Sequence, residues 1–190
     1  KYGNIPLPPY IRNKNTTEND KIRYQTIYSK YYGSAAAPTA GLHFDTEILK
    51  KIEDKGIKTA FVCLHVGLGT FQPIYKENIE EHKIHKEEYF IDQENADEIN
   101  KAIKNGKKII AVGTTSLRTL ETAFKNGAID AGKGESSLYI YPPYKLKIVN
   151  SLITNFHTPK STLLVLVAAI VGYEKLKEIY DHAIKEKYRF

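Results

Sequence analysis

Along the chain, segments whose apolar residues recur with the period of a helix alternate with short apolar runs typical of strands. Helical patterns, opened by an N-capping residue or closed by a glycine, run over residues 45–56, 92–107, 115–127 and 161–172, and an amphipathic pattern predicts a further helix over 173–188. Apolar runs predict strands over residues 57–66, 108–113, 136–143 and 149–156, and the first two read as strands buried on both faces. Strands that alternate with helices predict an α/β fold, with a mostly parallel sheet or an open barrel flanked by helices.

The first 22 residues do not follow this alternation. Three prolines in YGNIPLPPYI require extended backbone over residues 2–11, and the charged stretch Arg12–Lys21 is typical of a solvated loop. We therefore predict an extended arm and a charged loop over residues 1–22, followed by one α/β domain over residues 23–190.

Charge and cysteine content restrict the partners and the compartment. The chain has 28 Lys and Arg against 22 Asp and Glu, and the net charge of +6 fits a polyanionic partner. Because the lysines are dispersed, a lysine-rich solvated surface explains the same excess. Cys63 is the only cysteine, so no disulfide forms within the chain, which favours a reducing, cytoplasmic environment. No apolar run reaches the roughly 18 residues of a membrane span, so no membrane partner is expected.

Polar segments follow three of the predicted strands. HVGLGTFQPI ends the first strand, VGTTSLRTLE follows the second and NFHTPKSTLL ends the last. The carboxyl ends of parallel strands share one rim of a sheet, where α/β proteins bind their ligands. We therefore expect these three segments to meet in space.

The first segment has two glycines but lacks the third glycine of a dinucleotide-binding fingerprint. Pro73 also prevents immediate entry into a helix, so no helix N-terminus awaits a pyrophosphate. Gly67 and Gly69 instead allow backbone to approach a flat ligand, with Thr70 and Gln72 as hydrogen-bonding side chains. A plain turn explains the glycines equally well.

The second segment places hydroxyls and a cation at a helix start. Thr114, Thr115 and Ser116 come just before Arg118, and amides, hydroxyls and a guanidinium together suit a carboxylate or a phosphate. The alternative is capping by Ser116, with Arg118 and Glu121 as a surface pair.

The third segment repeats this design. Asn155 and His157 lie at a strand end, and Lys160 and Ser161 open an apolar helix. A lone histidine is usually structural, but its polar neighbours favour a functional interpretation of His157.

His82, His85 and Glu87 form a set of residue types that zinc sites use. The spacing argues against a metal site, because neither a helix nor a strand places all three side chains on one face. His85 and Glu87 as an acid–base pair, or as ordinary surface residues, are the alternatives. His43, at the end of the small-residue run GSAAAPTAGLHF, is a further candidate for proton transfer.

Together these motifs resemble the S-adenosylmethionine:tRNA ribosyltransferase-isomerase family of queuosine biosynthesis. The similar segments, in family order, are LPPYI, RYQTIYSKYYGSAAAPTAGLHF, HVGLGTFQPI, HKIHKEE, VGTTSLRTLE, IYPPYK, LITNFHTPKSTLL and EKYRF. Ile84 and Val165 stand where the family pattern has methionine, and Thr158 where it has leucine, with the spacing intact. The resemblance also implies that the chain is part of a longer protein and lacks the family's inserted β-barrel domain.

The resemblance implies an enzyme that transfers and isomerises the ribosyl unit of S-adenosylmethionine onto 7-aminomethyl-7-deazaguanine at the tRNA wobble position. Epoxyqueuosine-tRNA is then the product, and adenine and methionine are released. The expected partners are this tRNA and S-adenosylmethionine, which is consumed as a substrate. No cofactor and no metal are expected, and we expect a cytoplasmic monomer.

This reaction needs proton transfers and a binding site for the donor. The proton-transfer candidates are His43, His65, His85, Glu87 and His157. Arg118 with the Thr114–Ser116 amides is predicted to hold the methionine carboxylate. The other predicted substrate-binding residues are Gly67, Gly69, Thr70, Phe71, Gln72, Asn155, Phe156, Lys160 and Ser161.

Within this set, Phe71 or Phe156 is predicted to stack on adenine or to face the sulfonium, and Lys160 to meet tRNA phosphate. Two rival hypotheses are a metal-dependent hydrolase built on His82, His85 and Glu87, and a non-catalytic RNA-binding domain.

Overall fold

The structure, a computed structural model, describes residues 7, 18–67, 74 and 78–189. Its α-helices are α1 (Glu18–Arg23), α2 (Thr46–Asp54), α3 (Gln93–Lys104), α4 (Thr114–Ala123), α5 (Thr162–Val171) and α6 (Tyr173–Lys185). The 3-10 helices among the described residues are η1 (Thr39–His43) and η3 (Ile79–Glu81). The strands are β1 (Cys63–Leu64), β2 (Glu87–Ile91), β3 (Ile110–Val112), β4 (Phe124–Lys125), β5 (Ala128–Ile129), β6 (Gly132–Ser136) and β7 (Ser151–Ile153).

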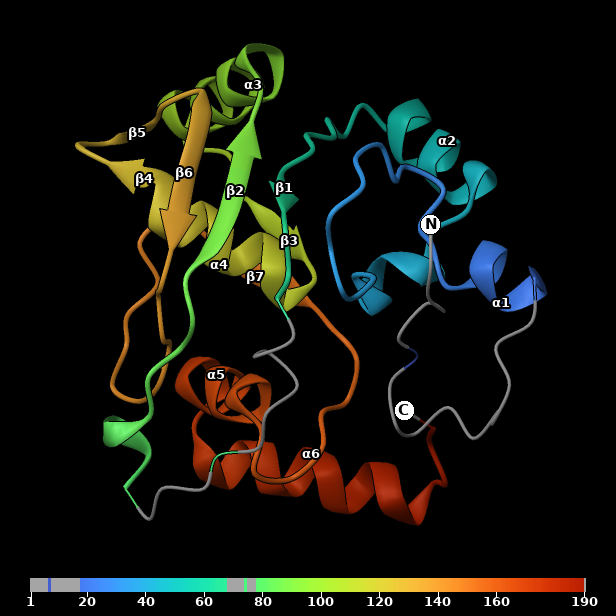
Figure 1. Ribbon diagram of the computed structural model, residues 1–190, viewed down its shortest axis with the longest axis vertical. Helices are drawn as coiled ribbons and strands as arrows, with labels where there is room; N and C mark the ends of the chain where they lie inside the picture. The colour runs from blue at the N-terminus through green and yellow to red at the C-terminus, as the bar shows by residue number, and fades with distance from the viewer. Residues whose placement is uncertain (1–6, 8–17, 68–73, 75–77, 190) are drawn as a thin grey trace.

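The strands form three small sheets. One has the order β1-β2-β6, and the others are the pairs β3-β7 and β4-β5. In Figure 1 the three-stranded sheet stands with α4 behind it, and α5 and α6 lie together below. Helices and sheets are thus mixed along the chain, as the α/β prediction requires.

The prediction of a mostly parallel sheet, or of an open barrel, is wrong for the described residues. Only β3 and β7 pair in parallel, and the other three strand pairs are antiparallel. The sequence pattern missed β2 and β6, which supply two of these antiparallel pairs, and the β4–β5 hairpin, which supplies the third. Buried side chains alternate along β2, at Glu87, Tyr89 and Ile91. Because the first of these is a carboxylate, the sequence does not show a clear alternation of apolar and polar residues.

β6 has the sequence GKGES and contains no apolar residue. Its Gly134 lies opposite Tyr89 in the β2–β6 register, and any side chain there would collide with the Tyr89 ring. An aromatic ring on the neighbouring strand covers the glycine and supplies the packing that the strand lacks. A strand of this kind is stabilised by its partner and leaves little trace in its own sequence.

The predicted capping of α2 and α3 is confirmed. Asp45 accepts a hydrogen bond from the Ile48 N–H at 2.7 Å, and Asp92 accepts one from the Asn95 N–H at 2.9 Å. Gly56 follows the end of α2 with a positive φ of 73°. These short-range rules act within one turn, so the sequence alone sets these helix ends.

Helix α4 ends at Ala123, four residues before the predicted end at residue 127. Asn126 and Gly127 have φ of 52° and 86°. They form the two-residue turn between β4 and β5, and the flanking residues Lys125 and Ala128 pair across the two strands. Asn-Gly is the strongest short-range signal of a β-hairpin, so this turn was readable in the sequence. The helix stop predicted at Gly127 is therefore wrong.

The predicted strand over residues 57–66 is largely wrong. Only Cys63–Leu64 pairs, and Ile57 and Phe61 are 53% and 43% exposed. Strand β3 is not buried on both faces either, since Ile110 is 54% exposed. The strand predicted over 136–143 is replaced by β6, and the one over 149–156 shortens to β7.

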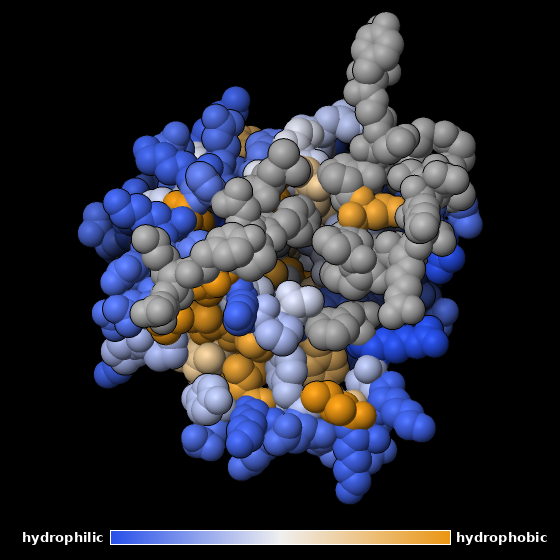
Figure 2. Space-filling model, turned by 60° about the horizontal axis from the view of Figure 1, so that its bottom comes forward, coloured by the Kyte–Doolittle hydropathy of each residue, from blue (hydrophilic) through white to orange (hydrophobic). Residues whose placement is uncertain are grey.

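The core lies between α4 and the sheets. Its most enclosed large apolar side chains are Ile91, Leu117, Ile129, Ile140 and Leu166, and α3, β5 and α5 close its edges. Helix α5, apolar throughout, is only partly enclosed, with Thr162 and Leu166 as its buried residues. Figure 2 brings forward the lower face of the molecule, where apolar side chains are visible between hydrophilic ones.

At the N-terminal end, Glu18–Arg23 forms helix α1, which corrects part of the loop predicted over residues 1–22. The rest of the predicted arm lies almost entirely outside the described residues, so the division at residue 22 stays a prediction. Among the described residues, no helix is long and apolar enough to cross a membrane.

Candidate functional site

The ends of β3 and β7 lie side by side. Val112 pairs with Ile153 in the parallel register, and the Gly113 N–H donates to the Ile153 carbonyl at 2.8 Å. The start of α4 therefore lies next to the segment Thr154–His157. This is the arrangement expected at the carboxyl ends of parallel strands, here produced by two strands alone.

The segment after β1 reaches the same region. The Ile74 N–H donates to the Lys160 carbonyl at 2.8 Å, which ties the far end of the 65–74 segment to the start of α5. The structure thus brings together the three segments whose meeting the sequence predicted. Gly69, Thr70, Phe71 and Gln72 lie outside the described residues, and their substrate-binding roles stay predictions.

Helix α4 begins without a side-chain cap. Its N-cap residue is Gly113, with a φ of 90°, so the alternative interpretation of Ser116 as the capping residue is wrong. The Leu117 N–H donates to the Gly113 carbonyl, and the N–H groups of Thr114, Thr115 and Ser116 precede this first helical bond. Thr114 is buried, whereas Thr115 and Ser116 are partly exposed.

The surface pair between Arg118 and Glu121, the other part of that alternative, is also wrong, because both side chains are buried and have separate partners. Glu121 accepts the N–H groups of Lys147, Ile148 and Val149 at 2.9–3.1 Å and the Tyr144 hydroxyl at 3.1 Å. Burial, and then the neighbouring Glu121 carboxylate, raise the pKa of Tyr144. Glu121 therefore holds the segment before β7 against α4.

His43 contacts Asn155 across the start of the site. The Asn155 Nδ2 atom lies 3.0 Å from His43 Nε2, and this bond joins the end of η1 to the segment after β7. His43 is exposed and Asn155 is partly buried. The arrangement leaves one histidine in contact with solvent at the meeting point of the strand ends.

His157 is partly buried, although its polar neighbours in the sequence favour a functional position over a structural one. Its Nε2 atom lies 3.0 Å from Thr154 Oγ1. Its main chain is held by Tyr180, whose hydroxyl accepts the His157 N–H at 2.7 Å and donates to the His157 carbonyl at 3.3 Å. Burial lowers the pKa of His157 to about 4, so the ring is neutral near pH 7.

His65 lies at the end of β1, with Gly33 against its ring. A Cβ atom at Gly33 would lie 2.9 Å from His65 Nδ1, and Gly33 has a φ of 129°. On the same side of the strand, Cys63 Sγ lies 3.9 Å from His65 Nε2, and burial raises the pKa of that thiol. Gly33, the first residue of the small-residue run, therefore leaves room for the His65 ring.

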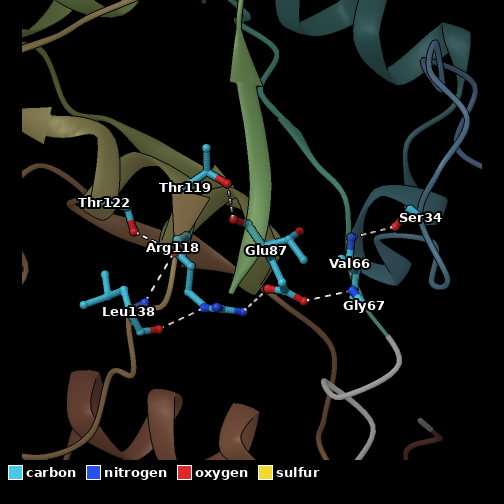
Figure 3. A network of polar contacts seen from close by, with 10 residues as sticks. Ser34, Val66, Gly67, Glu87, Arg118, Thr119, Thr122 and Leu138 are labelled. Carbon is cyan, nitrogen blue, oxygen red and sulfur yellow. Dashed lines mark hydrogen bonds and ion pairs between the residues drawn. The ribbon is translucent and has the colours of Figure 1, made fainter. Parts of the chain in front are cut away.

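Glu87 and Arg118 form a buried ion pair beneath this segment (Figure 3). Arg118 Nη1 donates to Glu87 Oε2 at 2.7 Å, and the side chains are 4% and 2% exposed. Glu87 Oε1 accepts the Gly67 N–H at 3.1 Å, and Arg118 Nε donates to the Leu138 carbonyl at 3.1 Å. The carboxylate therefore connects β2, α4 and the backbone that follows β1.

The structure does not gather His82, His85 and Glu87 as metal ligands. The His82 ring packs edge-on against Tyr139 with centroids 5.6 Å apart, His85 is exposed, and Glu87 pairs with Arg118. No group of three His, Cys, Asp or Glu side chains suited to a metal ion occurs in the part of the chain that the structure describes.

The remaining predicted residues surround the start of α5. Ser161 is the N-cap and accepts the Leu164 N–H at 3.2 Å, while Lys160 is exposed with a φ of 58°. The Phe156 ring packs edge-on against Tyr180 and Tyr188, at centroid distances of 5.2 and 6.1 Å. These contacts fix Phe156 against α6 and account for part of its apolar surface.

Sequence reasoning missed several partners that organise the site. Ser34, Leu138, Thr154 and Tyr180 hold the candidate residues through hydrogen bonds. Ser34 had a signal, since it is the polar residue in a run of small ones. Leu138 acts through its carbonyl group, which no sequence pattern reveals.

Fold and site together define a mixed α/β protein with polar loops, histidines and a helix N-terminus grouped at the ends of its strands, the arrangement of a ligand-binding or catalytic domain. Comparison with known proteins is more specific. The family described as queuosine biosynthesis protein matches residues 1–190, and the chain belongs to this family.

Relatives of known name resemble the chain over its whole length. An S-adenosylmethionine:tRNA ribosyltransferase-isomerase of Acetivibrio thermocellus is 56% identical over 191 residues, covering 100% of this chain and 55% of that protein. The protein of the same name from Treponema denticola is 54% identical over 192 residues, again covering 100% of this chain and 55% of that protein. The chain thus spans about half the length of these relatives.

A solved structure shares the fold. The crystal structure of an S-adenosylmethionine tRNA ribosyltransferase from Thermotoga maritima matches with a TM-score of 0.65 and 41% identity, covering 80% of this chain and 48% of that one. The family resemblance stated from the motifs is therefore confirmed.

Proposed function

We propose that this chain is part of an enzyme that transfers and isomerises the ribosyl unit of S-adenosylmethionine onto 7-aminomethyl-7-deazaguanine in tRNA. Epoxyqueuosine-tRNA is the product, and adenine and methionine leave. The observation that carries this proposal is the 54–56% identity, over the full chain, to relatives named for that activity. The meeting of three polar strand-end segments provides a place for the chemistry.

The reaction requires a base for the ribose carbon beside the sulfonium and an acid for the departing adenine. His43 and His65 suit these transfers, because both lie at the meeting point of the segments and neither is enclosed in the core. His85, exposed between η3 and β2, remains a further candidate.

His157 suits a different task. A buried ring with a pKa of about 4 is neutral at physiological pH and is a weak base. We assign it to hydrogen bonding with Thr154 and to fixing the segment after β7 through Tyr180. In that role His157 shapes the site without changing its charge.

The donor is an amino acid sulfonium, so its carboxylate needs an anion site. The first-turn amides of α4, at Thr114, Thr115 and Ser116, have the geometry and the partial positive charge for that task. Phe156 or Phe71 stacks on adenine or faces the sulfonium. The binding roles of Gly67, Gly69, Thr70, Gln72, Asn155 and Ser161 are part of the same proposal.

The acceptor is a tRNA, which requires cations at the rim and a compartment that contains tRNA. Lys160, exposed and adjacent to the start of α5, is our candidate for a phosphate contact. A cytoplasmic, monomeric enzyme is consistent with this substrate. S-Adenosylmethionine is consumed, and the proposal requires no cofactor.

The test uses the full-length protein, labelled S-adenosylmethionine and tRNA that carries 7-aminomethyl-7-deazaguanine. We expect stoichiometric release of free adenine and transfer of label from the ribose to tRNA. The matched control is the same tRNA with unmodified guanine at the wobble position, which should give neither. Label in tRNA from the methyl group, without adenine, would indicate a methyltransferase, and no heat of S-adenosylmethionine binding would favour an RNA-binding domain.

A further inference from the structure

The backbone of His65–Gly67 is held from two sides by elements distant in sequence (Figure 3). On one side, the Val66 N–H donates to Ser34 Oγ at 3.0 Å, and the Ala35 N–H donates to the Val66 carbonyl at 2.8 Å. On the other side, the Gly67 N–H donates to Glu87 Oε1 at 3.1 Å. Three consecutive main-chain groups are thus fixed just where β1 passes into the glycine-containing segment.

Glu87 is itself fixed by a charge. Its second carboxylate oxygen, Oε2, accepts from Arg118 Nη1 at 2.7 Å, and Arg118 Nε is anchored on the Leu138 carbonyl at 3.1 Å. The planar guanidinium holds both partners in one plane, so it fixes the direction in which Oε1 points. The Gly67 N–H therefore donates to a carboxylate oxygen whose position is set by α4 and by the segment after β6.

The stability of the fold does not by itself require this buried ion pair. A buried ion pair loses the hydration of both charges, and apolar residues of similar size would serve the core equally well. Arg118 Nη2 is buried and, among the described residues, has no hydrogen-bond partner, which is a further cost. Glu87 also occupies an inward position of β2, where Tyr89 and Ile91 are apolar.

We infer that Glu87 and Arg118 are positioning residues for the reaction, an inference that rests on the proposed function. They set the backbone of His65–Gly67 and, through it, the His65 ring that Gly33 admits. Arg118 Nη1 and Nε and both Glu87 oxygens have protein partners. The inference gives these two residues a positioning role in place of the direct roles predicted from sequence, which were carboxylate binding for Arg118 and proton transfer for Glu87.

The test compares Glu87→Gln with Glu88→Gln in the full-length enzyme. Glu88 is the next residue on β2, and its side chain is exposed on the opposite face, so it is a matched control. We expect Glu87→Gln to lower kcat/KM for adenine release about tenfold or more, because small displacements of reacting groups cost such factors. The pH–rate profile should keep both limbs, and Glu88→Gln should behave as wild type.

Hydrogen exchange gives a readout that does not depend on turnover. We expect exchange of the Val66 and Gly67 amides to become about tenfold faster or more in Glu87→Gln, as local opening becomes easier. Ser34→Ala, at an exposed position, removes the opposite contact and should give the same exchange and kinetic effects with little risk to folding.

Other outcomes overturn the inference. Loss of one limb of the pH profile in Glu87→Gln would make Glu87 a proton-transfer group. Unchanged exchange at Val66 and Gly67 in both variants would show that the contacts fix nothing. If wild-type enzyme releases no adenine, the proposed function fails, whereas the exchange experiment still reports whether the two contacts hold this backbone.

Discussion

His43 Nε2 lies 3.0 Å from the side-chain amide nitrogen of Asn155, a residue 112 positions later in the chain. An amide that donates to Nε2 requires the ring proton to be on Nδ1, so this contact selects one tautomer and one ring orientation. Asn155 is therefore more than a candidate ligand. It connects η1 to the end of β7 and fixes the orientation of the His43 ring.

The first prediction follows from this contact. We expect His43→Ala and Asn155→Ala each to lower the rate of adenine release by about 100-fold or more, since a proton-transfer group usually contributes roughly 10²–10⁴-fold. Because the two residues act as one unit, the double variant should be no slower than the slower single variant. His182→Ala, on the exposed face of α6, is the control and should keep wild-type turnover. Additive losses would mean that Asn155 acts independently of His43.

The second prediction concerns the pH dependence of stability. Burial lowers the pKa of His157 to about 4, whereas the unfolded chain has an ordinary histidine pKa near 6.5. As the pH falls, His157 is therefore protonated in the unfolded chain before it is protonated in the folded protein. The contribution of the neutral His157 ring to the free energy of unfolding is fully present above about pH 6.5. It is lost as the pH falls towards 4, and the loss is at most about 3 kcal/mol.

Urea unfolding of wild type and His157→Gln between pH 4 and 7.5 measures this effect. Their difference in the slope of unfolding free energy against pH should be confined to the window between about 4 and 6.5. His182→Gln serves as the surface control. Parallel curves for wild type and His157→Gln would show that the ring is not buried as a neutral group.

The sequence predicts features that depend on interactions between near neighbours in the chain, but not features that depend on contacts between distant residues. Asp45 and Asp92 act on amides three residues away, so their helices were predictable. The pairing of β2 with β6 joins Glu87 to Ser136 and depends on Tyr89 covering Gly134, which local period does not encode. Parallel topology was over-predicted for that reason, while the side-by-side ends of β3 and β7 were anticipated correctly.

The candidate site shows the same division. Residue types and spacing identified His43, Arg118, Asn155 and His157 as distinctive, but spacing cannot show whether a polar side chain faces solvent or the core. Arg118 proved to be 4% exposed, since Glu87 on β2 lies opposite it. A charged residue becomes buried only with a partner, and that partner came from a strand missed in the sequence.

The third prediction concerns Glu121, whose carboxylate accepts three consecutive main-chain N–H groups and the Tyr144 hydroxyl. Glu121→Ala would leave these buried donors unpaired, and we expect it to lower the free energy of unfolding by about 3 kcal/mol or more. Glu178→Ala removes an exposed carboxylate paired with Lys175, and should cost about 0–1 kcal/mol. Denaturant unfolding monitored by circular dichroism compares the two. Equal losses would contradict a structural role for the Glu121 contacts.

The fourth prediction separates backbone strain from the fit of His65. Gly33 and Gly56 both have positive φ, at 129° and 73°, so alanine at either position should cost about 1–3 kcal/mol of stability. Only at Gly33 would the new methyl group meet a functional ring, at 2.9 Å from His65 Nδ1, whereas a Cβ at Gly56 has no neighbour within 4 Å.

We therefore expect Gly33→Ala to lower kcat/KM for adenine release by about tenfold or more in the folded enzyme, because the His65 ring must move, while Gly56→Ala keeps wild-type kinetics. Steady-state rates at a temperature well below both unfolding midpoints make the comparison, with the folded fraction measured by circular dichroism. Normal kinetics in Gly33→Ala would show that the His65 ring position does not matter for turnover. The glycine would then serve the backbone alone.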